Sequence, residues 1–193
     1  MPPPRTPVSV RRVASVAFSI LFCACNGNAS PSDSAIEFEV EATYLYKFAP
    51  FVEWPASAYA SPSSPLNLCI VGSDPVASIV DQAAAGQSVG THPVAVHHIP
   101  EAVPGAGCQI MYIAGTEGQS VQQALAAMKG APVLTVTDEA SHPGDRGIIS
   151  FVVSDNHVRF DIDDAAAAQA GVTISSKLLG LAHSVKLPEA HKG

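Results

Sequence analysis

Residues 66–75, LNLCIVGSDP, have the pattern of a buried β-strand that leads directly into a helix. Residues 66–71 are apolar apart from Asn67, which is typical of a strand covered on both faces. Asp74 is suited to cap a helix N-terminus, and proline is favoured at the first helical position, where Pro75 stands. A strand followed by a helix is the repeating unit of α/β folds. This stretch therefore predicts a sheet with helices packed against it.

The same alternation of short strands and helices extends to both sides of this stretch. Further strands are predicted at residues 94–99, 109–113 and 132–136, and helices at residues 35–54, 75–85 and 118–129. The first of these helices carries an apolar stripe that continues past Pro50 as far as Trp54, and Pro55 is expected to end it.

The C-terminal third begins with a hairpin signal. Residues 147–153 and 157–162 flank Ser154-Asp155-Asn156, and Asp and Asn tolerate the positive φ angles of a tight hairpin turn. Asp163 or Asp164 then caps an alanine-rich helix that ends at Gly171. An amphipathic helix is predicted at residues 175–185.

These elements predict one α/β domain. We expect a Rossmann-like sheet of about five to six strands, partly parallel and flanked by helices, with a C-terminal β-hairpin and helix. The domain covers residues 31–193, and its core covers residues 36–186.

The first 30 residues have the layout of a secretory signal peptide. A basic segment precedes the short apolar run at residues 13–24, and small and polar residues follow. Two processing sites fit this layout. Residues 22–25, FCAC, loosely match a lipoprotein box with Cys25 as the lipidated residue, whereas residues 27–29, GNA, fit ordinary cleavage. Either one predicts export, which in a bacterium means the periplasm.

Composition excludes several classes of partner. Of the 193 residues, 47% are hydrophobic, which is enough for a packed core. Without the three arginines of the leader, 7 basic residues remain against 17 acidic ones, a net charge of −10. Such a domain repels phosphates, so neither nucleic acid nor an anionic membrane surface is an expected partner.

The cysteines predict one disulfide. Cys23 and Cys25 lie in the leader, so Cys69 and Cys108 alone remain in the domain. An oxidising compartment and an even count favour a bridge between them. Two buried free thiols and a metal pair are the alternatives, although two isolated cysteines lack the spacing of a zinc site.

No motif in the sequence predicts catalysis. The chain has no G-x-G-x-x-G, phosphate-binding loop or G-x-S-x-G sequence, and its histidines have no metal-binding spacing. Asp161, Asp163 and Asp164 lack the glycine and distal glutamate of a calcium loop and are better explained by helix capping. We therefore expect a protein that is not an enzyme and that holds no cofactor or metal.

Aromatic residues are concentrated in the predicted first helix and just after it. They are Tyr44, Tyr46, Phe48, Phe51, Trp54 and Tyr59. Most of them fit a core-facing stripe, but Tyr46 lies off that stripe, and an apolar surplus on a second face often marks a protein contact. Both interpretations stay open at this point.

Seven sequence blocks resemble those of the YfiR-like family of exported bacterial proteins, in the order found in that family. They are YLYKFA with FVEWP (44–55), LCIVGSDP (68–75), CQIMYI (108–113), VLTVTD (133–138), IISF (148–151), VRFDI (158–162) and GVTISSKLL (171–179). Together they cover residues 37–185.

The resemblance implies a periplasmic regulator without catalytic activity. Its implied partner is an inner-membrane diguanylate cyclase of the YfiN type, or another membrane sensor protein, whose periplasmic region it binds. Binding represses the cyclase, so cyclic di-GMP and biofilm formation fall, and an outer-membrane lipoprotein of the YfiB type relieves the repression. The resemblance also implies a disulfide at Cys69 and Cys108. The further cysteine pair that some family members carry near the hairpin is missing here.

A partner-binding surface is expected where the aromatic helix meets the C-terminal segment. The residues assigned to it are Tyr46, Trp54, Arg159, Ser175, Ser176 and Lys177. Arg159 is its expected charged anchor because arginine is enriched at interfaces, although it could instead pair with a neighbouring aspartate. The alternative function is a small-molecule sensor or solute-binding accessory protein with a cleft near residues 72–75. The sequence also leaves a homodimer open.

Overall fold

The strand and helix predicted around residues 66–75 are confirmed in the computed structural model, which describes residues 33–188. Strand β2 (Leu66–Gly72) is followed by helix α2 (Pro75–Ala84). Asp74 caps the helix, because its Oδ1 atom accepts a hydrogen bond from the backbone N–H of Ala77 at 2.7 Å.

The other helices are α1 (Asp33–Lys47), α3 (Val121–Ala127), α4 (Asp164–Gln169) and α5 (Ser176–Leu179), with two short 3₁₀ helices, η1 (Ala49–Phe51) and η2 (Ala56–Ala58). The other strands are β1 (Val52–Glu53), β3 (Ser88–Val89), β4 (His92–Ile99), β5 (Ile110–Gly115), β6 (Leu134–Asp138), β7 (Ile149–Ser154), β8 (His157–Asp163), β9 (Thr173–Ile174) and β10 (Ser184–Lys186). In the described part of the chain, no helix has the length and apolar character needed to cross a membrane.

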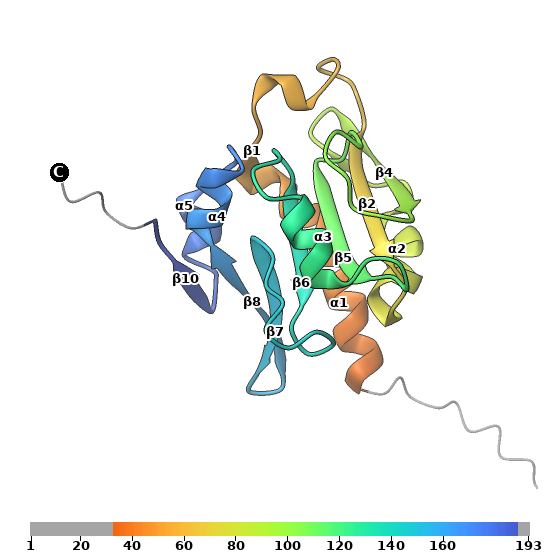
Figure 1. Ribbon diagram of the computed structural model, residues 1–193, viewed down its shortest axis with the longest axis vertical. Helices are drawn as coiled ribbons and strands as arrows, with labels where there is room; N and C mark the ends of the chain where they lie inside the picture. The colour runs from red at the N-terminus through yellow and green to blue at the C-terminus, as the bar shows by residue number, and fades with distance from the viewer. Residues whose placement is uncertain (1–32, 189–193) are drawn as a thin grey trace, which may run out of the picture. The chain divides into compact units, whose positions relative to one another are not determined.

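Eight strands form one sheet in the order β10-β8-β7-β6-β5-β2-β4-β3 (Figure 1). Strands β4, β2, β5, β6 and β7 run parallel, whereas β8 pairs antiparallel with β7 in the predicted hairpin. Asp155 and Asn156 turn the hairpin with φ angles of 53° and 57°. The α/β fold class is confirmed, and the sheet is wider than expected because the short strands β3 and β10 extend its edges.

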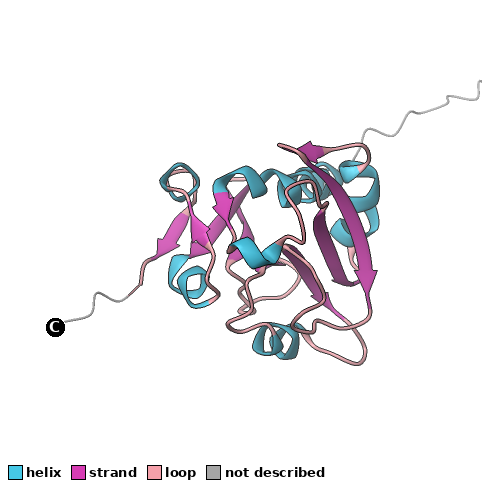
Figure 2. Ribbon diagram, turned by 90° about the horizontal axis from the view of Figure 1, so that it is seen from above, coloured by secondary structure: helices cyan, strands magenta, loops and turns pink. Residues whose placement is uncertain are grey.

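Helices cover both sides of the twisted sheet (Figure 2). Side chains alternate along each strand, so Leu68 and Ile70 of β2 pack in the larger core, which contains apolar residues of α1 and α2. Cys69 and Val71 pack in the smaller core, together with Val121 of α3. The resulting order of layers is helices, sheet, helix.

Two helix predictions are wrong in extent. The helix predicted at residues 35–54 ends at Lys47, and the chain continues through η1 into β1. Pro50 lies in η1, where its lack of a backbone N–H and its fixed φ angle are tolerated. The helix predicted at residues 175–185 is a single turn, α5, after which β10 joins the sheet parallel to β8. The export signal predicted at residues 1–30, with Cys25, lies outside the described residues.

Candidate functional site

A groove of about 300 Å³ lies where α1, β8 and α5 meet. Its lining is apolar and largely aromatic, with two basic residues. The lining residues are Tyr44, Lys47, Phe48, Phe51, Val158, Arg159, Phe160, Leu178 and Leu181. The predicted meeting of the aromatic helix with the C-terminal segment is therefore present, and it forms a concave surface.

The pairing of two short strands brings the C-terminal segment close to the end of the first helix. Strands β1 and β9 pair antiparallel, with Val52 opposite Ile174. The N–H of Ser175 then donates to the carbonyl oxygen of Phe51 at 2.8 Å. The side chain of Ser175 caps α5 by accepting from the N–H of Leu178. These contacts place Leu178 and Leu181 opposite the end of α1.

The aromatic rings that line the groove are held by one another and by the core. Phe48 and Phe160 contact edge to face with ring centroids 5.2 Å apart, and Tyr44 meets Phe160 at 6.2 Å. Behind them, the fully buried Phe151 lies 5.9 Å from Phe48. Such ring clusters resist rearrangement because interiors are close-packed. The groove is therefore a preformed feature of the fold.

Lys47 and Arg159 add positive charge to a protein that is acidic as a whole. Both side chains are exposed, and within residues 33–188 neither forms an ion pair. The alternative in which Arg159 pairs with a neighbouring aspartate is therefore not found. Asp161 instead contacts Arg146, with Nη1 2.8 Å from Oδ2. A groove with an apolar lining and unpaired cations suits a partner segment that is apolar and acidic.

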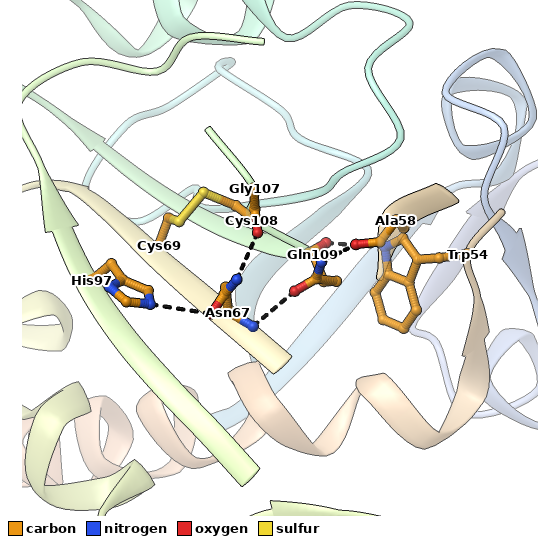
Figure 3. Close-up of a disulfide and its surroundings, with 8 residues drawn as sticks. All are labelled: Trp54, Ala58, Asn67, Cys69, His97, Gly107, Cys108 and Gln109. Atoms are coloured by element: carbon orange, nitrogen blue, oxygen red, sulfur yellow. Dashed lines mark hydrogen bonds between the residues drawn. A yellow bond between two sulfur atoms is a disulfide. The ribbon is translucent and has the colours of Figure 1, made fainter. Parts of the chain in front are cut away.

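Trp54 is held away from the groove by a polar network around Gln109 (Figure 3). Its indole N–H donates to the carbonyl oxygen of Gln109 at 3.0 Å. The Gln109 side chain accepts from the N–H of Asn67 and donates to the carbonyl oxygen of Ala58. Because Gln109 is buried, these bonds fix the loop after β1 to strands β2 and β5.

Cys69 and Cys108 form a disulfide beside this network (Figure 3). Both cysteines are buried, with exposed fractions of 2% and 5%. The bridge links β2 to the residue two positions before β5, so it fixes the start of one of the central strand pairs.

The residues predicted for partner binding lie in three places: in the groove, beside it and in the interior. Arg159 lines the groove, and Ser176 and Lys177 are exposed on the adjacent α5. Ser175 is occupied as the cap of α5. Tyr46 is only 8% exposed and belongs to the core, because the face of α1 opposite the Tyr44 stripe is also covered.

Sequence reasoning missed part of this groove. Lys47 and Leu181 were not proposed, although a lysine inside an aromatic run and a leucine beyond the family-like GVTISSKLL block are signals that could have identified them. Leu181 is 64% exposed, which is unusual for a large apolar side chain. Within residues 33–188, no group of three or more His, Cys, Asp and Glu side chains could hold a metal ion.

The fold and the groove define a small α/β domain with an apolar groove beside a disulfide-linked sheet. Residues 38–183 match the family model described as YfiR/HmsC-like, and the chain belongs to this family. Proteins of this family are periplasmic and generally regulatory, and they act with a membrane-associated partner. The comparison with curated proteins gave no match.

Proposed function

We propose that this protein is an exported regulator that binds the periplasmic region of an inner-membrane diguanylate cyclase and holds the enzyme inactive. The observation that carries the proposal is the groove of Tyr44, Phe48, Arg159 and Leu181 in a YfiR/HmsC-like chain. The partner segment places an apolar side chain on the aromatic lining and acidic groups beside Lys47 and Arg159. Cyclic di-GMP and biofilm formation fall when the complex forms.

A site-specific crosslinking experiment tests the proposal. A photoreactive amino acid replaces Val158 in the groove of the full chain, and in a parallel strain it replaces Gln122, an exposed residue of α3. We expect an inner-membrane protein with a diguanylate cyclase domain to be captured from position 158 and not from position 122. Deletion of the gene should raise cyclic di-GMP in the same strain.

Two charge-matched variants identify the surface. Arg159→Glu should abolish the crosslink and raise cyclic di-GMP, because it places a negative charge where we expect an acidic partner segment. Lys129→Glu makes the same change on an exposed residue outside the groove and should leave both unchanged. Equal effects of the two variants, or capture of the cyclase from position 122 alone, would contradict a partner site at the groove.

A second candidate function is binding of a small molecule at the carboxyl ends of β2 and β5. An open depression of about 480 Å³ lies there and is lined in part by Gly72, Ser73 and Thr116. Its position fits the place where α/β sheets commonly bind ligands. This function predicts a ligand that raises the unfolding temperature of both wild type and Arg159→Glu, with no membrane protein captured from position 158.

A further inference from the structure

Three carboxyl groups and a tyrosine gather where α1 crosses the sheet. Glu41 comes from α1, Asp74 from the turn after β2, Tyr112 from β5 and Asp138 from the end of β6. Strand β5 is the neighbour of both β2 and β6, which brings these groups together. Glu41 is only 3% exposed and Asp138 only 1%. None of these side chains belongs to the groove.

Hydrogen-bond donors are distributed unequally among the three carboxyl groups. Asp74 accepts from the N–H of Ala77 at 2.7 Å and from the hydroxyl of Tyr112 at 2.6 Å. Asp138 accepts backbone N–H groups from Ala140 and Ser141 and the hydroxyl of Ser141. The Oε2 atom of Glu41 is buried and has no partner among the described residues.

This distribution determines which group carries a proton. Donors stabilise a carboxylate, and both aspartates have them, whereas the Oε2 atom of Glu41 has none among the described residues. A charged Glu41 would lie in the interior near two like charges, with no donor for its Oε2 atom among the described residues, so its charged form is disfavoured. The folded chain therefore favours the neutral form of Glu41.

The surroundings of Glu41 contain no compensating cation in the described part of the chain. Burial has the largest effect on it, followed by Asp138, Asp74 and, on its own helix, Glu37, and together they raise its pKa from 4.5 to about 8. Tyr112 faces the same cluster, but its hydroxyl donates its hydrogen bond to Asp74. Helix α2 and strand β8 also pack against α1 and contribute no charged group that acts on Glu41.

Glu41 lies on the helix that builds one wall of the groove. Tyr44 follows it by three residues on α1, and Phe48, directly after α1, follows it by seven, so all three lie on one side of the helix and its immediate continuation. Any loosening of α1 from the sheet therefore also displaces the aromatic lining of the groove.

We propose that Glu41 is a proton-dependent latch, so that α1 stays on the sheet while Glu41 is protonated and detaches more readily when the carboxyl group releases its proton to water. The effect of Glu41 on the opening of α1 depends only on the buried cluster of carboxyl groups and Tyr112. An effect on partner binding rests on the function proposed above.

Hydrogen exchange of the full chain between pH 5.5 and 9 tests the latch. The observable is the opening constant of the α1 amides, corrected for intrinsic exchange, with α3 amides as the internal reference. Because the open state exposes Glu41, this constant should rise about tenfold per pH unit up to about pH 7.5 and level off above pH 8. The α3 amides should show no such rise.

Glu41→Gln keeps the shape of the side chain and removes its charge. In this variant the opening constant of α1 should be independent of pH. Glu39→Gln is the matched control, since Glu39 is exposed on the same helix, and it should behave as wild type. An α1 opening constant that is flat in wild type, or that still rises in Glu41→Gln, would overturn the latch.

A direct titration keeps the proposal testable if Glu41→Gln does not fold. NMR of the glutamate side-chain carboxyl groups in wild type should detect one group that titrates near pH 8. If every glutamate titrates near pH 4.5, the latch is wrong. If α1 loosens with pH while crosslinking from position 158 does not change, the latch is supported and opening of α1 does not control partner binding.

Discussion

Gly72 is the residue at which the backbone geometry of this fold is most constrained. It ends β2 with a φ angle of 101°, and it lies against Gly115 at the end of β5. A Cβ atom added to Gly72 would collide with the carbonyl oxygen of Gly115. The two neighbouring strands can approach this closely only without a side chain at position 72. Glycine is therefore required here by space as well as by conformation.

Gly72→Ala is expected to destabilise the protein far more than Gly86→Ala. Gly86 also has a positive φ angle, 70°, but an added Cβ would meet nothing within 4 Å. Gly86→Ala should cost about 1 kcal/mol, the usual penalty for alanine in this conformation. Gly72→Ala adds a backbone collision and should cost about 3 kcal/mol or more. Urea unfolding measures both, and equal costs would contradict the steric argument.

Single residues with a local role could be predicted from the sequence, whereas residues with long-range partners could not. Asp74 as a cap and Asp155-Asn156 as a turn depend on their immediate neighbours, and both are confirmed. Gln109 is different, because a lone glutamine before a strand gives no signal of its bonds to Asn67 and Ala58. Those partners are 42 and 51 residues away in the sequence.

The predicted end of the first helix is wrong because the apolar periodicity of the sequence continues beyond that helix. Phe48, Phe51 and Val52 continue the apolar stripe of α1, yet they occupy the helix end, a 3₁₀ turn and a strand. All three conformations bury the same side of the chain, so the pattern alone does not reveal where α1 ends. Strand β10 was missed for a related reason, because its three residues form a strand only by pairing with β8.

The disulfide links two elements of the fold and should contribute strongly to the stability of the protein. Cys69 and Cys108 are 39 residues apart, and closing a loop of this size stabilises a protein by about 4 kcal/mol on the chain-entropy model. Reduction should therefore lower the free energy of unfolding by about this amount. Cys69→Ala/Cys108→Ala is the control, since its stability should not respond to a reductant. A response in the variant, or none in wild type, would contradict this.

At the scale of the whole molecule, the candidate site depends on a juxtaposition that the sequence only partly revealed. The groove combines the end of α1, β8 and α5, and the pairing of β1 with β9 brings α5 to α1. Each two-residue strand is too short to be recognised from a pattern. Arg159 could be proposed from its chemistry, whereas the burial of Tyr46 could not be predicted, because burial of a second helix face depends on tertiary packing.

Two carboxyl groups predict a stability maximum at mildly acidic pH. Burial acts to raise the pKa of Asp161, but hydrogen bonds from Ser184, Arg146 and His183 lower it overall. Its stabilising effect is therefore present above the ordinary pKa of 3.8 and is lost as the pH falls further. Glu41 acts in the opposite direction, since its raised pKa means that the folded state binds a proton that the unfolded state has released.

Between pH 5 and pH 8, the free energy of unfolding should therefore fall by about 3.5 kcal/mol because of Glu41, since a difference of one bound proton changes it by about 1.4 kcal/mol per pH unit. Urea unfolding followed by the fluorescence of Trp54, the one tryptophan of the chain, measures this at each pH. Glu41→Gln should remove the fall in stability toward pH 8 and leave the loss of stability at acidic pH unchanged. Asp161→Asn should weaken the loss at acidic pH and keep the fall toward pH 8. If the decline toward pH 8 is the same in Glu41→Gln as in wild type, a group other than Glu41 causes it.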